Sequence, residues 1–357
     1  MTSIKKITPS DRELLFLSWP IFVELFLRVV IGNINVWMIS HYSEPAVASI
    51  GAANQLLNLM VFVYGFITIG TQIIIAQYIG ANKLRDIKHV IHTALFGSFT
   101  IGMMISIVFF FFSKSLLTFM NLNEELIQIG NSYLQIFGGS LIISALSAVI
   151  IAILRTHGHT KPALLIPMTA SILSVIGNYF VLYQPFGLPS FGVSGLAYSS
   201  VFGNMIGLII SVALLKRYIG FSIFSFRFRK ISFPILKAIL MYGLPSSGET
   251  LSYQGAQVVV TMIVASLGAS VLIAKSYISA ITQFVYLIAS ALSQGNQIMV
   301  GRDVGAGEFE RAYNRGMRTT IIGASASLII CLITFIFIEP IMGIFRSEEH
   351  TSELQSP

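Results

Sequence analysis

The chain repeats itself at a fixed offset of 225 residues, and both copies lie in apolar sequence. The recurring features are a proline, a glutamate, a glycine–x–glutamine triplet and a glycine–alanine pair, at 20/245, 24/249, 70–72/295–297 and 80–81/305–306. No residue is inserted or deleted between the proline and the glycine–alanine pair in either copy. A hydrophobic chain built twice predicts two packed helical bundles with a site between them, as in many secondary transporters.

The composition is typical of an all-α polytopic membrane protein. Hydrophobic residues make up 55% of the chain, charged residues only 10%, and the mean hydropathy is +0.80. A soluble domain carries about 25% charged residues. Crossing a bilayer takes about 20 apolar residues, and nine stretches are long enough to be spans: 14–39, 47–79, 91–112, 130–154, 163–184, 193–215, 235–266, 271–300 and 319–338. No small-residue cleavage site follows the first stretch, so we expect it to be retained.

The basic residues predict the orientation of the chain in the membrane. With a cytoplasmic N-terminus, eighteen lysines and arginines fall in inside segments and only Lys114 and Lys275 in outside segments. The positive-inside rule therefore predicts a multi-pass protein of the plasma (inner) membrane with its N-terminus in the cytoplasm. This topology accounts for the net charge of +7, and because the basic residues are scattered among short loops no nucleic-acid partner is expected.

The two copies of the repeat are expected to have the same orientation. Six spans separate Pro20 from Pro245, and an even number of crossings makes the repeats parallel, related by an axis along the membrane normal. We predict a first six-helix bundle over 1–215, a basic cytoplasmic linker over 216–237, and a second bundle from 238 to 345. The linker alternates Phe and Arg, which fits either an amphipathic strip on the inner membrane surface or a solvated loop.

Four stretches in order carry a resemblance to the multidrug and toxic compound extrusion (MATE) transporters over residues 12–345. They are the first-helix Pro20 and Glu24, the run GTQIIIAQYIGANK at 70–83, the run ILRTHGHTKP at 153–162, and Asn178 followed by FGLPSFGVSGLA at 186–197. The resemblance implies a secondary active transporter that exports organic cations or drugs in exchange for Na⁺ or H⁺ by alternating access. It implies no cofactor besides the coupling ion, and we expect a monomer.

The resemblance also predicts that the second bundle is incomplete. Each half of a MATE transporter has six helices, whereas the second copy here reaches only its third, so about nine of twelve transmembrane helices are expected. Residues 346–357, RSEEHTSELQSP, resemble an in-frame translation of a common sequencing-library adapter. We therefore expect this tail to be foreign to the natural protein.

Three charged residues lie deep within the predicted spans, away from their ends: Glu24, Arg28 and Glu249. An ionisable group at the centre of a membrane helix costs about 2.5–3.5 kcal/mol or more, so each needs a partner or a water-filled cavity. Glu24 and Arg28 lie one helical turn apart and can neutralise one another. Glu249 has no basic residue one turn away, and Tyr253 shares its face, so Glu249 is the best candidate for a cation-binding carboxylate. The alternative is a structural carboxyl beside the Pro245 kink.

One position departs from the MATE pattern. Many members carry an aspartate, tied to cation coupling, fifteen residues after the first-helix proline, where this chain has Asn35. An amide oxygen can ligate Na⁺, but an amide cannot release a proton near neutral pH. Asn35 and Asn178, which matches a family asparagine, are therefore candidate cation or substrate ligands. Together with Asn33, Asn54 and Asn58 they line a polar cavity or, alternatively, serve helix packing.

No enzyme signature accompanies these features. The six histidines form no metal-ligand pattern on one helix, and a P-loop is absent from the sequence, so ATP is not expected to be the energy source. A lipid or polysaccharide flippase of a related two-bundle fold is the alternative function. It would be expected to place more cationic residues in the cavity, to hold a lipid pyrophosphate, whereas the sequence offers only Arg28.

Overall fold

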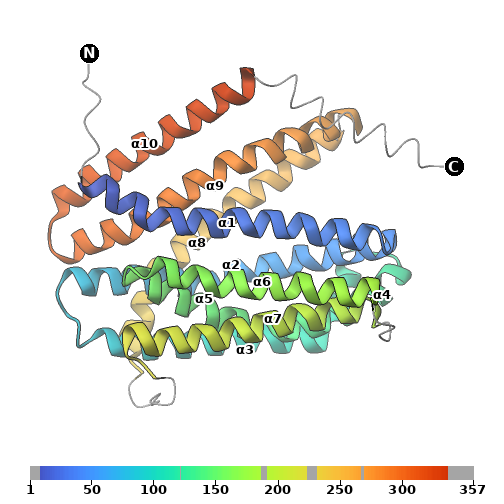
Figure 1. The fold of residues 1–357 in the computed structure, drawn as a ribbon, viewed down its shortest axis with the longest axis horizontal. Coiled ribbons are helices and arrows are strands. Elements are labelled where there is room, and N and C mark those ends of the chain that lie inside the picture. The colour runs from blue at the N-terminus through green and yellow to red at the C-terminus, as the bar shows by residue number, and fades with distance from the viewer. Residues whose placement is uncertain (1–8, 121, 186–190, 223–230, 267–268, 337–357) are drawn as a thin grey trace.

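The computed structural model describes residues 9–120, 122–185, 191–222, 231–266 and 269–336. All regular structure in these residues is helical (Figure 1). The elements are α1 (Pro9–Ser40), α2 (Glu44–Gly80), α3 (Ile87–Phe119), α4 (Glu124–Gly139), α5 (Leu141–Thr156), α6 (Thr160–Tyr183), α7 (Gly192–Leu214), the π-helical turn η1 (Leu215–Ile219), α8 (Phe233–Ser266), α9 (Ala269–Gly305) and α10 (Phe309–Ile336). The predicted tail at 346–357 and residues 223–230 of the predicted linker lie outside the described residues.

The predicted spans correspond to helices of the structure. Among the described residues, five helices (α1, α2, α3, α6 and α7 with η1) are long and apolar enough to cross a membrane by themselves. A sixth span is formed by α4 and α5 together. The prediction of an all-α, multi-pass membrane protein is therefore confirmed. The single span predicted at 130–154 was wrong in detail, because the chain bends by 43° between α4 and α5, at Ser140.

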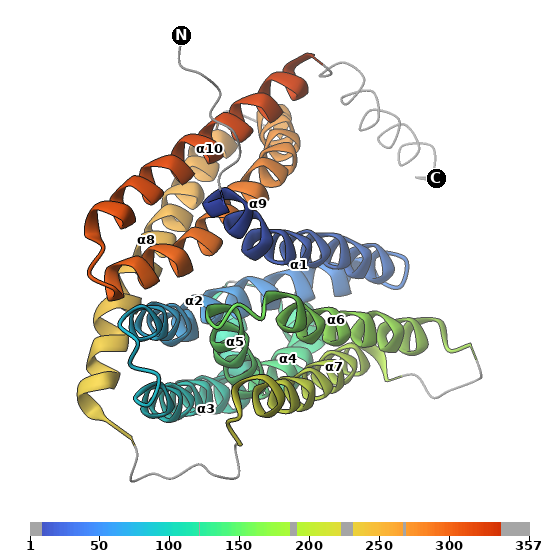
Figure 2. The ribbon, with the colours of Figure 1, turned by 60° about the vertical axis from the view of Figure 1, so that its left-hand side comes forward.

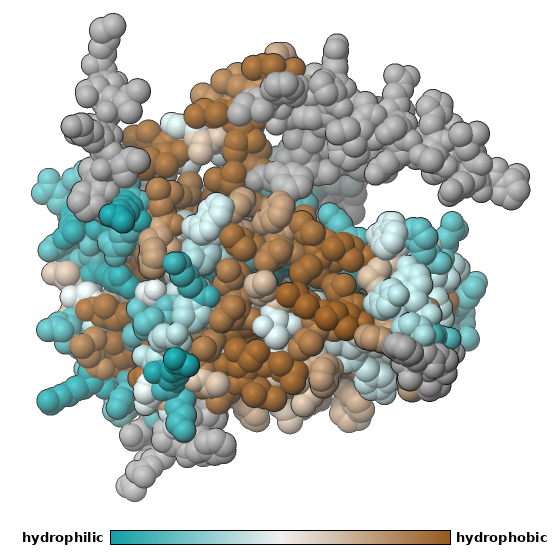
Figure 3. All heavy atoms as spheres, in the orientation of Figure 1, coloured by the Kyte–Doolittle hydropathy of each residue, from teal (hydrophilic) through white to brown (hydrophobic). Residues whose placement is uncertain are grey.

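The first bundle, α2 to α7, is held by two apolar cores. One is centred on fully buried Ile75, Ile91 and Ile153, and the other on Phe109, Leu117 and Leu134. Apolar side chains also cover much of the middle of the outer surface, with hydrophilic residues gathered toward both ends (Figure 3). This distribution is expected of helices that cross a hydrocarbon layer and carry their polar residues at its two faces.

The two halves of the repeat pack crosswise on one another. The first helix of the second half, α8, lies against α2, and α1 lies against α9 (Figure 2). At the α2–α8 crossing a Cβ on Gly70 would overlap the backbone of Ile239, and a Cβ on Gly243 would overlap that of Phe66. Ile239 of α8 belongs to the core of the first bundle. These glycines are therefore required for the close approach of the halves.

The repeated glycine–alanine pairs lie side by side where α2 and α9 end. A Cβ on Gly80 would overlap the carbonyl of Arg302, and a Cβ on Gly305 would overlap that of Gln77, which is the same contact after the 225-residue offset. Although glycine often supplies the left-handed turn that ends a helix, neither Gly80 nor Gly305 does so here. The positive φ angles occur two residues later, at Asn82 and Gly307, because Gly80 and Gly305 are needed for helix contact instead.

The halves are close at one end and diverge at the other. The α2–α3 and α9–α10 turns lie at the close end, whereas α8 and α9 separate from α1 and α2 toward the end that carries the α1–α2 turn (Figures 1 and 2). The basic segments assigned to the inside, including 83–88, 155–161 and 302–318, lie at or near the close end. This arrangement positions a central cavity between the halves.

Candidate functional site

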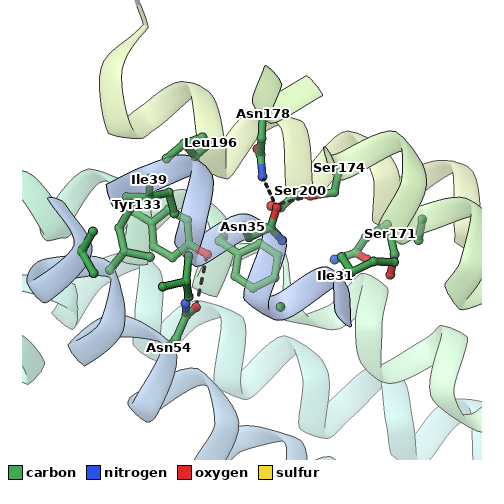
Figure 4. Close-up of a pocket in the computed structure, with 17 residues that line it drawn as sticks. Ile31, Asn35, Ile39, Asn54, Tyr133, Ser171, Ser174, Asn178, Leu196 and Ser200 are labelled. Carbon is green, nitrogen blue, oxygen red and sulfur yellow. Dashed lines mark hydrogen bonds between the residues drawn. The ribbon is translucent and has the colours of Figure 1, made fainter. Parts of the chain in front are cut away.

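A polar cavity of about 270 Å³ lies inside the first bundle, between α1, α2, α4, α6 and α7 (Figure 4). Its polar lining consists of amides and hydroxyls: Asn35, Asn54, Asn178, Asn204, Tyr133, Ser171, Ser174 and Ser200. The structure thus brings the two predicted ligands Asn35 and Asn178 together, and Asn54 with them. Asn33 and Asn58 are not among the residues that line it.

The amides of this cavity bond to one another. Asn178 Nδ2 donates to Asn35 Oδ1 at 3.1 Å, and the Tyr133 hydroxyl donates to Asn54 Oδ1 at 3.2 Å. Asn178 is buried, and its own Oδ1 has no hydrogen-bond partner. The cavity therefore offers neutral oxygen atoms, and no carboxylate is among its lining residues. Amide and hydroxyl oxygens suit a hard cation and cannot exchange a proton near neutral pH.

A second cavity, of about 540 Å³, lies between the two halves and is called the central cavity below. It is formed by α2 and α5 of the first half and α8 and α9 of the second. Its charged lining residues are Glu249 and Arg155. Gln72 Nε2 donates to Gln297 Oε1 at 3.2 Å, so the glutamines of the repeated triplets meet each other here, on the axis that relates the halves.

Glu24 is buried beside this cavity and is neutralised twice. Its Oε1 lies 3.4 Å from Arg28 Nη2, which confirms the predicted pair, and its Oε2 forms an ion pair with Arg155. Arg155 was counted only as an inside basic residue, yet it is 9% exposed and its Nη1 also donates to Gln294 Oε1 of α9 at 3.2 Å. The ion pair between Glu24 and Arg155 joins residues 131 positions apart, and no local spacing in the sequence predicts it.

Glu249 is exposed to the central cavity and differs from Glu24 in having no ion pair. Within the part of the chain that the structure describes, no hydrogen bond or salt bridge involves its carboxylate. Its neighbour Tyr253 lines an adjoining cavity of about 600 Å³, which shares Thr250 and Tyr286 with the central cavity. Of the predicted site residues, Glu249 is thus the one that presents an uncompensated charge to open space, whereas Arg28 lines neither of these two cavities.

Lys275, which was counted with the outside segments, is part of a helix. It lies inside α9, lines the adjoining cavity with Tyr253, and donates to the Thr261 hydroxyl of α8. The apolar run begins before residue 275, so the sequence itself contained a sign that the lysine belongs to a helix. The adjoining cavity is otherwise lined by amides, hydroxyls and aromatic rings.

Ionic contacts close the cavity at the end where the halves meet. Arg302 of α9 contacts Glu13 Oε1 of α1 at 3.3 Å and donates to the Thr156 carbonyl at 2.7 Å. Arg318 of α10 lies 2.5 Å from Asp11 of α1. Each contact joins the first half to the second, and together they form the closed-end contacts of the molecule. Their separation would be required for the cavity to open on this side.

Comparison with known proteins agrees with this geometry. The sequence matches the MatE family over residues 20–180 and 245–356. It is 34% identical to the "Uncharacterized transporter YisQ" of Bacillus subtilis over 344 residues, which is 96% of this chain and 76% of that protein. It is 23% identical to the "Probable multidrug resistance protein NorM" of Thermotoga maritima over 348 residues, covering 96% and 74% of the two chains.

Solved structures show the same fold. The crystal structure of MATE in the bent conformation superimposes with a TM-score of 0.86 at 20% identity, covering 95% of this chain and 75% of that one. The outward-facing conformation of a multidrug resistance MATE family transporter gives 0.84 at 21% identity, covering 96% and 77%. A MOP superfamily transporter from Pyrococcus furiosus, described as having a binding pocket of reverse polarity, gives 0.83 at 19% identity over 96% and 77%.

Proposed function

The chain belongs to the MATE family of membrane transporters, and from that premise we propose that it exports small organic cations or drugs in exchange for Na⁺ or H⁺. The substrate binds in the central cavity between the halves, and the coupling ion in the same cavity or in the first-bundle cavity. We further propose that the protein lies in the plasma (inner) membrane with its N-terminus in the cytoplasm.

The observation that carries the proposal is the unpaired carboxylate of Glu249. It lines a cavity shared by both halves, whereas Glu24 at the equivalent repeat position is neutralised by two arginines. In a cavity surrounded by hydrocarbon, an uncompensated negative charge strongly favours a bound cation. The nearby aromatic ring of Tyr286 adds a surface on which an organic cation can rest.

The shape of the molecule supports alternating access. Ionic contacts and interlocked glycines close the end that carries the basic segments, and the helices diverge at the opposite end. By the positive-inside rule the closed end is cytoplasmic, so the structure corresponds to an outward-open state. Transport then requires the closed-end contacts to break while the opposite end closes.

The uncharged lining of the first-bundle cavity favours Na⁺ rather than H⁺ as the ion that binds there. Asn35 and Asn178 present amide oxygens in a partly enclosed, neutral site. Such a site can replace part of the hydration shell of Na⁺ but has no group that exchanges a proton near pH 7. If H⁺ is the coupling ion, it therefore acts at a carboxylate of the central cavity.

The test is transport of ethidium in inside-out vesicles under a Na⁺ gradient or a pH gradient imposed separately. We expect uptake driven by at least one gradient and its loss in Glu249→Gln. Glu125→Gln, which makes the same substitution at an exposed position, serves as the matched control and should leave uptake unchanged. Absence of uptake under both gradients, with correctly folded protein, would contradict the proposal.

The flippase alternative gains one observation from the structure. Lys275 and Arg155 both line the cavities, so the basic residues are more numerous than the sequence indicated. Arg155 is already neutralised by Glu24, which leaves Lys275 alone to hold a pyrophosphate. Transfer of a fluorescent polyprenyl pyrophosphate across liposomes, without ethidium transport, would favour the flippase.

A further inference from the structure

The two intramembrane carboxylates occupy equivalent positions of the repeat but have different charged neighbours. Glu24 and Glu249 occupy equivalent positions, 225 residues apart, whereas the position of Arg28 is occupied by Tyr253 in the second half. Glu24 therefore has a basic residue on its own helix and Glu249 does not. In addition, Glu24 holds Arg155, so the first carboxylate has two positive partners and the second has none in the described residues.

Arg155 contacts one carboxylate and lines the same cavity as the other. It is in the last turn of α5, its guanidinium contacts Glu24, and its side chain lines the same cavity of about 540 Å³ as Glu249. Arginine has a long side chain with five donors and keeps its charge in proteins. Glu24 would retain Arg28 if Arg155 left, so its charge would remain compensated.

We propose that Arg155 is a built-in competitor for the cation site, with its guanidinium exchanging between Glu24 and Glu249. A monovalent organic cation binds Glu249 while Arg155 stays on Glu24, and Arg155 takes its place at Glu249 when the cation leaves. The inference rests on the proposed function, since it names the group against which the substrate competes.

Charge balance favours such an exchange. With Arg155 on Glu24, the cluster of Glu24, Arg28 and Arg155 carries one excess positive charge while Glu249 carries an uncompensated negative charge. Moving one guanidinium pairs every carboxylate of the site without bringing in an ion. A carboxylate left uncompensated in a low-dielectric cavity is costly, so pairing Glu249 with Arg155 offsets part of the loss of the Glu24–Arg155 contact seen in the structure.

The exchange does not require the halves to separate. Arg155 belongs to the first half and now contacts the second half through Gln294. After the exchange it would contact the second half through Glu249. The contact between halves would therefore change from a hydrogen bond with an uncharged amide to an ion pair when the substrate leaves, and substrate binding would weaken it again. The strength of the contact between the halves would therefore depend on whether a substrate is bound in the central cavity.

The test measures binding of tetraphenylphosphonium to the purified protein in lipid nanodiscs. Glu24→Gln removes one of the two carboxylates between which the Arg155 side chain exchanges. We therefore expect Arg155 to neutralise Glu249 and the affinity for tetraphenylphosphonium to fall about tenfold. Arg155→Gln removes the competitor and should bind at least as tightly as the parent. The double variant should regain the affinity of Arg155→Gln, because the effect of Glu24→Gln acts through Arg155.

The matched control is Arg28→Gln, which removes the other arginine of Glu24 but leaves Arg155 in place. It lies outside the cavity lining, with its side chain 63% exposed. Because it leaves Arg155 as the remaining arginine on Glu24, the affinity should not fall below that of the parent. A double variant that binds no better than Glu24→Gln, or an Arg155→Gln variant that binds more weakly than the parent, would overturn the proposal. Thermal unfolding of each variant identifies those that have lost the fold, and for these Glu24→Met and Arg155→Met, which remove the same charges, give the same comparison.

Failure of the proposed function has a different signature. Glu249→Gln should abolish tetraphenylphosphonium binding in every background if Glu249 is the cation site. If Glu249→Gln binds like the parent, Glu249 is not the cation site, and the proposed function and the competition are both refuted. If Glu249→Gln abolishes binding while Arg155→Gln weakens it, the cation site stands and the competition is refuted.

Discussion

The carboxylates Glu24 and Glu249 show how one sequence position can have two environments. Both follow a proline by four residues inside a membrane helix. Glu24 is buried and bound by Arg28 and Arg155, whereas Glu249 faces a cavity without a partner. A buried, paired carboxylate contributes to structure, and an unpaired carboxylate in a cavity contributes to ligand binding.

Glu249→Gln is therefore expected to lower cation efflux more than Glu24→Gln. Loss of a charge-assisted contact with the substrate corresponds to about tenfold in affinity or more. The measurement is the initial efflux rate at matched protein abundance in the membrane. Equal rates in the two variants would contradict the assignment of Glu249 as the cation ligand, and loss of protein from the membrane in both would indicate a structural role.

His157 is expected to make stability depend on pH. Burial, assisted by the positive charges of His159 and Arg302, holds the pKa of His157 below its ordinary value. The folded protein therefore binds fewer protons here than the unfolded chain, so stability falls as the pH drops through the unfolded value of about 6.5. His157→Gln should reduce the loss of melting temperature between pH 7.5 and pH 5.5.

The matched control is His41→Gln. The Nδ1 atom of His41 also lies near the carbonyl four residues earlier, at 2.9 Å from that of Trp37, but His41 is exposed at the other end of the molecule. Its substitution should leave the pH dependence of melting unchanged. An identical pH dependence in the parent and in His157→Gln would refute the role of this histidine.

At the scale of helices, the crossing of α2 and α9 depends on two glycines. Gly80 lies against the carbonyl of Arg302, and Gly305 against that of Gln77, with no room for a Cβ. Close backbone approach through small residues is the usual way in which membrane helices associate. This contact is made twice by the repeat, so it holds both halves at the closed end.

Gly80→Ala is expected to destabilise the protein by about 2 kcal/mol, as overpacking commonly does. Gly51→Ala, in the same helix but with open space around the added methyl group, is the matched control. It should raise stability slightly, by up to about 1 kcal/mol, because alanine has the higher helix propensity. The measurement is the thermal unfolding midpoint in one detergent. A Gly80→Ala midpoint equal to or above that of Gly51→Ala would contradict the packing argument.

The helices themselves could largely be predicted from the sequence, because their length and hydrophobicity are local properties. The bend at Ser140 has a signal in the sequence, Gly138 and Gly139 directly before it, but glycine is also frequent inside straight membrane helices, so the run was predicted as a single span. The pair of Glu24 with Arg155 also escaped prediction, because it depends on how α1 and α5 pack, and residue spacing reveals only neighbours on one helix. Asn35 and Asn178, by contrast, were brought together as the resemblance suggested.

For the whole molecule, orientation and conformation are linked. The basic segments lie at the end where the halves meet, so the side of the membrane on which they lie decides which way the structure is open. The division into a first bundle at 1–215, a linker and a second bundle remains a prediction. The last residues of the predicted linker belong to α8, which begins at Phe233.

The linker is predicted to be cytoplasmic. A Ser225→Cys variant in a Cys331→Ser background should resist a membrane-impermeant maleimide added to intact cells and react after the membrane is permeabilised. His41→Cys, in the turn region at the opposite end, should show the reverse preference. Labelling of Ser225→Cys in intact cells would show that the linker lies outside the cell. The predicted topology would then be reversed, and the structure would be open toward the cytoplasm.

The closed-end contacts are predicted to set how often the cavity opens to the cytoplasm. Arg302→Gln removes the ion pair with Glu13 and weakens the bond to the Thr156 carbonyl, both between halves. Arg311→Gln is its control, because Arg311 bonds to Glu308 and Asp303 within the second half. Ser293→Cys, in the lining of the central cavity, reports opening in a Cys331→Ser background.

In inside-out vesicles, a membrane-impermeant maleimide reaches Ser293→Cys from the cytoplasmic side only when the closed end opens. Loss of an exposed ion pair worth up to about 1 kcal/mol, together with the weakened bond to the Thr156 carbonyl, should raise the labelling rate several-fold in Arg302→Gln. The rate in Arg311→Gln should match the parent, since its contacts do not cross between the halves. Equal rates in all three proteins would mean that the glycine crossing at Gly80 and Gly305, rather than the ionic contacts, keeps this end closed.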